Sequence, residues 1–171
     1  MQIQFKTSTM RLEDIPLDIG YASEQVTLTK EDGQTYDIAG QNGKTQLIIT
    51  VPFINEPLIS ELKEIATMIP KEEEHEVTAS LIVAKEGHQD PGLEGFDFLI
   101  DSKGEFGDWY GLRLVGGPLE GEFTKAVTLI SKDGALFYDE YPANLDDPFK
   151  HDTLLRKIAA AQTCYTGKGC H

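Results

Sequence analysis

The stretch TQLIITVPFINEPLISELKEIATMI, residues 45–69, decides the fold, because it joins a buried strand to an amphipathic helix. Residues 46–51 are uncharged and rich in β-branched side chains, as is typical of a strand buried on both faces. Pro52 has no N–H to donate and ends the strand, and Asn55 is suited to cap the helix. Apolar side chains then recur at helical spacing, at Leu58, Leu62, Ile65 and Ile69. Junctions of this kind often carry chemistry at the helix end, yet this one has no Cys, Ser or His.

The length of the chain predicts a single domain over residues 1–171, because 171 residues suffice for one well-buried core and are few for two. Apolar residues make up 40% of the chain, as in globular proteins, and no apolar run approaches the roughly 20 residues that cross a bilayer. The N-terminal stretch MQIQFKTSTM lacks the apolar core of a signal peptide, so we expect a cytoplasmic location.

The charge of the chain is strongly negative, with 15 Lys and Arg against 29 Asp and Glu and a net charge of −14. This charge repels phosphate backbones and anionic lipids, so neither nucleic acid nor a membrane is expected as the main partner. The densest acidic run, KEEEHE at residues 71–76, is interpreted as a solvated turn rather than as a metal site on His75.

The remaining pattern predicts an α/β domain with a mixed sheet covered by helices. Two short segments around Ser8 and Thr9 indicate an N-terminal hairpin, and the Asp-Gly pairs at 32–33 and 133–134 indicate two more. Residues 85–95 and 115–121 are rich in glycine and are expected to be loops. Further strands are expected at 26–29, 34–38, 77–84, 96–100, 126–130 and 136–141, and further helices at 106–112 and from Asp147-Pro148 onward.

Three stretches give the chain a resemblance to a known family. They are VPFINEPLISELKEI at 51–65, FGDWYGLRLVGGPLEGEFTKAVTLISKDG at 106–134 and ALFYDEYPANLDDPFKHDTLLRKIA at 135–159. Together they resemble the thioredoxin-fold peroxiredoxins, specifically the atypical two-cysteine thiol peroxidases. The resemblance implies a thioredoxin-like α/β fold of peroxiredoxin type, with a mixed central sheet flanked by helices and an N-terminal β-hairpin. It also implies thiol-based redox chemistry without a bound cofactor, in a homodimer.

The family's catalytic residues are largely replaced. The family pattern is a Pro, then a Thr or Ser, then the peroxidatic Cys, with an Arg on a later strand. Pro52 is present, whereas Glu56 stands at the Thr position, Ile59 at the Cys position and Lys125 at the Arg position. The segment that carries the family's resolving Cys is reduced here to the 85–95 loop, which has no Cys.

These replacements predict that the family's chemistry is absent from this site. Peroxide reduction needs a thiolate whose pKa is lowered by its surroundings, and Ile59 cannot be a nucleophile in any protonation state. Glu56 adds negative charge, and Lys125 lacks the bidentate fork of an arginine. We hypothesise that Glu56 and Lys125 pair with each other. The ordinary interpretation, of a helix-start acid, a core isoleucine and a strand lysine, is favoured over new catalysis.

Both cysteines, Cys164 and Cys170, lie in a C-terminal tail at 162–171 that the resemblance does not cover. The pair is open to several interpretations: a local disulfide, free thiols, a redox-active dithiol, or metal ligands together with His171. We expect an intrachain disulfide, because the intervening residues include two glycines. His88 and His151 are expected to be surface residues.

The sequence therefore predicts a diverged thiol-peroxidase-like protein that lacks the family's peroxidase activity and acts as a redox-associated binding or regulatory protein. The alternative is a thiol-dependent peroxidase or oxidoreductase that uses Cys164 and Cys170. The expected partners are a second copy of the chain and a redox protein. The short helix with Trp109, the only tryptophan, is expected at the homodimer interface unless Trp109 packs in the core of one subunit.

Overall fold

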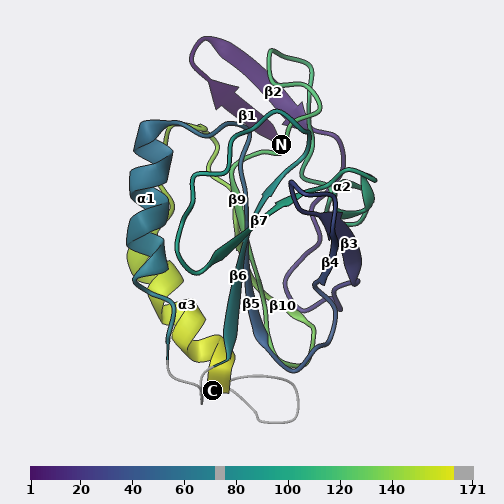
Figure 1. Cartoon of the computed structure of the whole chain (residues 1–171). Coiled ribbons are helices and arrows are strands. Elements are labelled where there is room, and N and C mark those ends of the chain that lie inside the picture. The colour runs from purple at the N-terminus through teal and green to yellow at the C-terminus, as the bar shows by residue number, and fades with distance from the viewer. Residues whose placement is uncertain (72–75, 164–171) are drawn as a thin grey trace.

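A computed structural model of the chain, which describes residues 1–71 and 76–163, contains a mixed seven-stranded sheet and a small three-stranded sheet (Figure 1). The strands are β1 Gln2–Phe5, β2 Ser8–Leu12, β3 Val26–Thr29, β4 Thr35–Ile38, β5 Thr45–Thr50, β6 Val77–Val83, β7 Phe96–Ile100, β8 Leu114–Val115, β9 Ala126–Ile130 and β10 Leu136–Glu140. The helices are α1 Glu56–Ala66, α2 Glu105–Tyr110 and α3 His151–Thr163.

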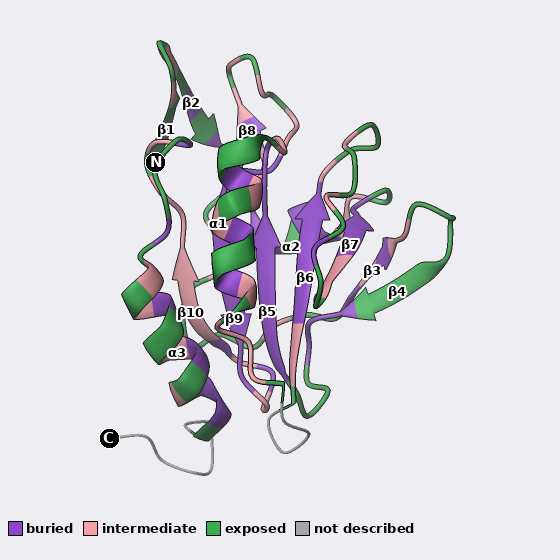
Figure 2. Cartoon of the chain, turned by 60° about the vertical axis from the view of Figure 1, so that its left-hand side comes forward, coloured by how far each residue is buried: buried purple, intermediate pink, exposed green. Residues whose placement is uncertain are grey.

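The larger sheet has the strand order β10-β9-β5-β6-β7-β3-β4, so β5 is an interior strand between β9 and β6, as the sequence predicts. β5, β6 and β7 are parallel, whereas β9 runs antiparallel to β5. Every residue of β5 is buried, because α1 and α3 cover one face of the sheet and α2 packs on the other (Figures 1 and 2). Leu47 and Ile49 point to the first face and Ile48 to the second.

α1 begins where the sequence predicts it and ends earlier. The Asn55 side-chain oxygen accepts a hydrogen bond from the Leu58 N–H at 3.0 Å, which confirms the predicted cap. The predicted extension to Ile69 is wrong, because the helix ends at Ala66. Beyond it the N–H groups of Thr67, Met68 and Ile69 bond to carbonyls three residues back, and Pro70 cannot continue a helix.

The N-terminal hairpin is present, with a turn that differs from the predicted one. Phe5 pairs with Ser8, so the turn is at Lys6 and Thr7 rather than at Ser8 and Thr9. Lys6 has a positive φ of 55°, which the sequence does not signal. β8 pairs with β2 and completes the three-stranded sheet, so the predicted 115–121 loop begins one residue too early.

α2 is bonded to one residue that precedes it in the chain, Asp101, and to one that follows it, Arg113. The Asp101 carboxylate accepts the N–H groups of Phe106 at 3.0 Å and Gly107 at 2.9 Å. Burial raises the pKa of Asp101 even though these two bonds act in the opposite direction. Arg113 bonds to Asp108 at 2.9 Å, and Trp109 on the same helix is 55% exposed, which excludes its packing in the core of one subunit.

No helix within the described residues is long and apolar enough to cross a membrane.

Candidate functional site

Two cavities adjoin at the beginning of α1, and both are lined by Phe53 and Asn55. The Glu61 cavity has a volume of about 310 Å³ and is lined by Phe53, Asn55, Pro57, Leu58, Ser60, Glu61, Glu64, Lys125, Leu145, Asp146, Pro148 and His151. The Ile59 cavity has a volume of about 750 Å³ and is lined by Phe53, Ile54, Asn55, Glu56, Ile59, Gly87, His88, Gln89, Asp90 and Pro91. Three of the four positions that the family uses for its chemistry are divided between these two cavities, with Lys125 on the first and Glu56 and Ile59 on the second.

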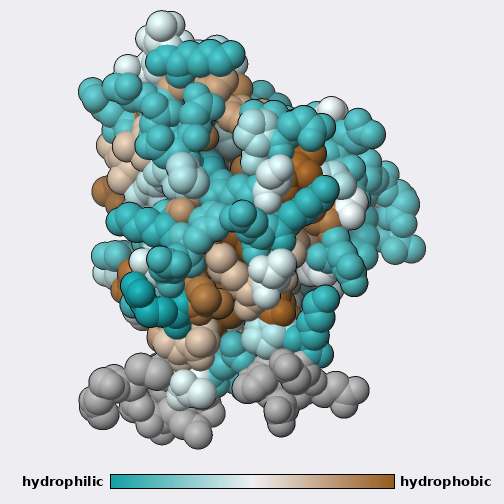
Figure 3. Space-filling model, turned by 90° about the vertical axis from the view of Figure 1, so that its left-hand side faces the viewer, coloured by the Kyte–Doolittle hydropathy of each residue, from teal (hydrophilic) through white to brown (hydrophobic). Residues whose placement is uncertain are grey.

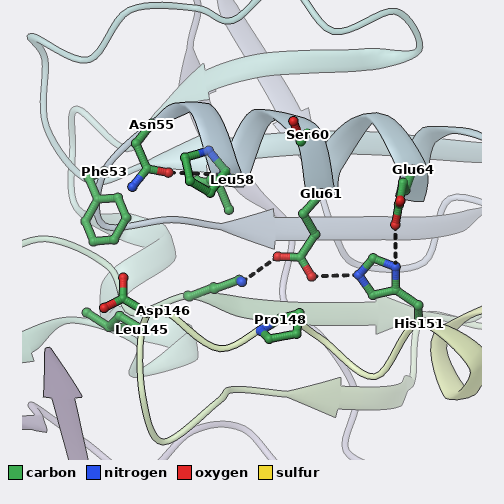
Figure 4. A pocket seen from close by; sticks show the side chains of 12 residues that line it. Phe53, Asn55, Leu58, Ser60, Glu61, Glu64, Leu145, Asp146, Pro148 and His151 are labelled. Atoms are coloured by element: carbon green, nitrogen blue, oxygen red, sulfur yellow. Dashed lines mark hydrogen bonds and ion pairs between the residues drawn. The ribbon is translucent and has the colours of Figure 1, made fainter. Parts of the chain in front are cut away.

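The Glu61 cavity contains a chain of charged groups from three elements (Figure 4). Lys125, just before β9, places its Nζ 2.5 Å from Glu61 Oε1 on α1. His151, the first residue of α3, places Nε2 2.7 Å from Glu61 Oε2 and Nδ1 3.2 Å from Glu64 Oε2. Glu61 therefore joins the start of β9, α1 and the start of α3.

Glu61 is ionised and well buried, with 9% of its side chain exposed. Burial alone raises the pKa of a carboxyl, but hydrogen bonds from Lys125, His151 and the Phe149 N–H outweigh burial and lower the pKa of Glu61. The Phe149 N–H lies 2.7 Å from Glu61 Oε2. Removal of this carboxylate would leave the nearly buried Lys125 ammonium without its counter-charge.

The expected pair of Glu56 and Lys125 is wrong. Lys125 instead bonds to Glu61 and to the carbonyl of Asp147 at 2.7 Å, and its Nζ lies 4.8 Å from the centre of the Phe149 ring. Glu56 is exposed and lines the Ile59 cavity, which Lys125 does not line. The structure therefore separates the residues at the family's Thr and Arg positions.

Ile59 lines the second cavity and is half-buried against the core that α1 forms with the sheet. Pro52 is buried just after β5 and lines neither cavity. Of the four family positions, only Glu56 and Ile59 lie together around one cavity.

Both histidines that were expected at the surface are half-buried and bonded. His88 Nε2 lies 2.5 Å from Glu122 Oε2, with 19% and 13% of the two side chains exposed. His151 is 24% exposed and contacts Glu61 and Glu64, as described above. The surface prediction for His88 and His151 is therefore wrong, and each faces one of the two cavities.

The geometry gives little support to nucleophilic catalysis within the described residues. Neither cavity has a Cys among its lining residues. Ser60 lines the Glu61 cavity, but its side chain points away from His151 (Figure 4), so no Ser–His pair forms there. Across the described ranges, no cluster of three His, Cys, Asp or Glu side chains could hold a metal. Cys164, Cys170 and His171, as disulfide, redox or metal candidates, lie outside the described residues.

Sequence reasoning missed Glu61, Glu122 and the role of the two histidines. A partial signal for Glu61 was present, because Glu61 lies at the edge of the apolar face that Leu58, Leu62 and Ile65 form on α1. A charged residue on a buried helix face needs a partner. Glu122 gave no such signal, since its contact with His88 joins loops that are distant in the sequence.

Comparisons with known proteins agree on the fold. No family model matches the chain. The chain is 28% identical over 178 residues to a thiol peroxidase of Campylobacter jejuni, covering 99% of this chain and 98% of that protein. A peroxiredoxin-like protein from Aquifex aeolicus has a TM-score of 0.81 at 19% identity, covering 94% of this chain and 97% of that one. A thiol peroxidase from Chromobacterium violaceum has a TM-score of 0.76 at 18% identity, covering 92% and 95%. The predicted thioredoxin-like fold of peroxiredoxin type is confirmed.

Proposed function

We propose that the chain is a thiol-peroxidase-like protein with the peroxiredoxin fold that has no peroxidase activity at the family's site and acts there by binding. In this proposal it is a redox-associated binding or regulatory protein. The observation that carries the proposal is the side chain of Ile59, which lines the cavity where the resemblance places the peroxidatic Cys. An aliphatic side chain can offer contact area to a ligand but no thiolate.

The position of Lys125 supports the same proposal. Stabilisation of a thiolate or a polarised peroxide needs a cation directed at the reacting atoms. The Lys125 ammonium is directed at Glu61 and the Asp147 carbonyl instead. With Glu56 on the Ile59 cavity, the charge that lines this cavity is negative, which disfavours an anionic intermediate.

Stopped-flow measurement of peroxide consumption tests this proposal. The full-length protein is compared with free cysteine at equal thiol concentration, and with a Cys164→Ser/Cys170→Ser variant at equal protein concentration. We expect the protein to consume peroxide no faster than the free thiol does. Rapid turnover that persists in the double variant would refute the proposal, because that variant has no thiol left.

The alternative function is thiol-dependent oxidoreduction by Cys164 and Cys170. It is favoured by one observation, that both cysteines of the chain fall within seven residues of each other, after α3. Titration of free thiols before and after peroxide treatment distinguishes the two functions. Loss of two thiols with peroxide and their recovery with a dithiol reductant would favour the alternative.

The proposed partners are a second copy of the chain and a redox protein, in the cytoplasm. Trp109 on α2 is 55% exposed and Ile15 is 87% exposed. The backbone carbonyl of Ile15 lies so close to Gly111, the residue after α2, that a side chain there would collide with it. The backbone of Ile15 therefore lies beside the end of α2. Exposed aromatic and aliphatic residues on neighbouring segments are typical of an interface and support the homodimer.

A further inference from the structure

The Ile59 cavity combines apolar walls with negative charge. Phe53, Ile54, Ile59 and Pro91 supply the apolar side chains. Glu56, in the first turn of α1, and Asp90, in the loop after β6, are both exposed and line the same cavity. No Lys or Arg is among its lining residues within the described chain. The cavity is therefore complementary to a positively charged group carried on an apolar neighbour.

The beginning of α1 does not reverse this preference. Free N–H groups at a helix N-terminus favour anions. Here the Asn55 side-chain oxygen accepts the Leu58 N–H at 3.0 Å, and the Ile59 N–H bonds to the Asn55 carbonyl at 2.9 Å. Pro57 has no N–H to offer. The first turn of α1 therefore leaves few donors for an anion.

The lysines that flank the cavity are engaged elsewhere. Lys85, in the loop that also carries Asp90, donates to the Glu120 carbonyl at 3.0 Å. Lys125 donates to Glu61 in the neighbouring cavity. His88, which lines the Ile59 cavity, is engaged as well, because its Nε2 lies 2.5 Å from the Glu122 carboxylate.

We propose that the Ile59 cavity is a docking site for a basic segment of a partner protein, in which Lys or Arg side chains alternate with apolar ones. An apolar side chain of the segment contacts Ile59 and Phe53, and a neighbouring cation reaches the carboxylates of Glu56 and Asp90. The chain's net charge of −14 favours the encounter with such a partner. This inference names the partner class for the proposed binding function and rests on it.

Fluorescence anisotropy with a defined probe tests the docking site on the full-length protein. The probe is a fluorescein-labelled seven-residue peptide of alternating Leu and Arg, measured at low and at physiological salt. One control peptide has citrulline in place of every Arg, and a second has Ser in place of every Leu. We expect measurable binding of the probe only, because the site needs both the cation and the apolar side chain.

Two protein variants locate the contact. Glu56→Gln/Asp90→Asn should weaken probe binding by about fivefold to tenfold, since two exposed ion pairs are lost while the Asp90 acceptor to the Gly92 N–H is kept. The matched control Glu24→Gln/Glu31→Gln removes the same charge from exposed residues that do not line the cavity and should change binding by less than about twofold.

Several results would overturn the docking site. Equal weakening in both variants would indicate attraction to the overall charge only. Binding of the citrulline peptide would remove the role of the cation. Displacement of the probe by N-acetylarginine amide at the same guanidinium concentration would indicate a site for small cations. No probe binding, with peroxide turnover also absent, would refute the docking site and leave the proposed function standing. Turnover that persists without the two cysteines would refute the proposed function, whatever the peptides do.

Discussion

Lys125 and Glu61 form a nearly buried ion pair, with Nζ 2.5 Å from Oε1 and 5% and 9% of the two side chains exposed. The pair joins the residue before β9 to the middle of α1. The surface on the side of the molecule shown in Figure 3 combines hydrophilic residues with apolar patches. At the corresponding strand position, the resemblance implies an arginine directed at a thiolate. Here the cation has partners within the protein, the Glu61 carboxylate and the Asp147 carbonyl.

Glu61→Gln is expected to lower the free energy of unfolding at pH 7 by about 3–5 kcal/mol, because the Lys125 ammonium stays buried without a counter-charge. The measurement is urea unfolding followed by circular dichroism. Glu64→Gln is the matched control on the same helix. Glu64 is 73% exposed and its contact with His151 is at 3.2 Å, so its loss should cost less than about 1 kcal/mol. Equal costs for the two variants would contradict the buried pair.

The Lys125→Met/Glu61→Gln double variant should recover most of the stability that Glu61→Gln loses. Removal of both charges together avoids an unpaired buried ion, and the methionine places an uncharged side chain of similar length near the Phe149 ring. The same urea series measures the double variant and the two single variants. A loss equal to the sum of the two single losses would show that Lys125 and Glu61 act independently.

Glu61 should also make the protein sensitive to acid. Hydrogen bonds hold the pKa of Glu61 in the folded state below its ordinary value of 4.5, although burial acts against them. The contribution of the Glu61 carboxylate to the free energy of unfolding is therefore present above pH 4.5. It is lost as the pH falls through the lower pKa that Glu61 has in the folded state. The stability difference between the wild type and Glu61→Gln should shrink between pH 5 and pH 3.

Asp101 provides the opposite case on the other face of the sheet. Burial raises the pKa of Asp101 above its ordinary value of 3.8, so its protonated form is favoured in the folded state. As the pH falls through this raised pKa, the wild type should gain stability relative to Asp101→Asn. The stability difference between wild type and variant should therefore change in opposite directions for Asp101→Asn and Glu61→Gln as the pH falls. A change in the same direction for both variants would contradict at least one of the two pKa shifts.

The sequence predicts most of the fold because its signals are local. Pro52, Asn55 and the Asp-Gly turn at 32–33 each fix the backbone through their own chemistry, and the elements around them lie as expected. The sequence does not predict β8, because its two residues, Leu114 and Val115, form a strand only by pairing with β2. No periodicity can show in so short a segment.

The charged pairs of the site escape prediction for a different reason. A sequence shows which residues can pair but not which carboxylate faces a given lysine. Glu56 and Glu61 are five residues apart on α1, which places their side chains about 140° apart around the helix. Only Glu61 lies on the side that meets Lys125 and His151. The assignment of Ile59 to the family's Cys position, in contrast, follows from the resemblance and needs the sequence alone.

Ile59→Cys is expected to restore little peroxidase activity. The new thiol would lie beside the Glu56 carboxylate, and Lys125 would remain bonded to Glu61, so no cation would lower the thiol pKa. Absorbance of the thiolate at increasing pH should give a thiol pKa at or above about 8.5. These measurements use a background without Cys164 and Cys170. Peroxide consumption more than about a hundredfold faster than that of free cysteine would contradict this prediction.

Trp109→Glu is expected to convert a dimer into a monomer. The indole is 55% exposed on α2. A glutamate at this position would bury an unpaired carboxylate in the interface, and its desolvation would outweigh the free energy of association. Light scattering at micromolar concentration should give the wild type twice the chain mass of 19.0 kDa and the variant a single chain mass. Tyr36→Glu, at an exposed aromatic on β4, is the control and should stay dimeric. A wild-type mass near 19.0 kDa would refute the dimer.

Cys164 and Cys170 are expected to form an intrachain disulfide in the purified protein. Five residues separate them, and Gly167 and Gly169 permit a turn that brings the two Cα atoms within the roughly 4.4–6.8 Å that a disulfide needs. So short a ring constrains little of the unfolded chain, so its effect on stability should be about 2 kcal/mol at most. Intact mass after alkylation without reductant measures the bond, and Cys164→Ser is the control because it leaves one thiol to alkylate. Full alkylation of both wild-type thiols would refute the disulfide, and a dimer on a non-reducing gel that Cys164→Ser/Cys170→Ser abolishes would place the bond between two chains.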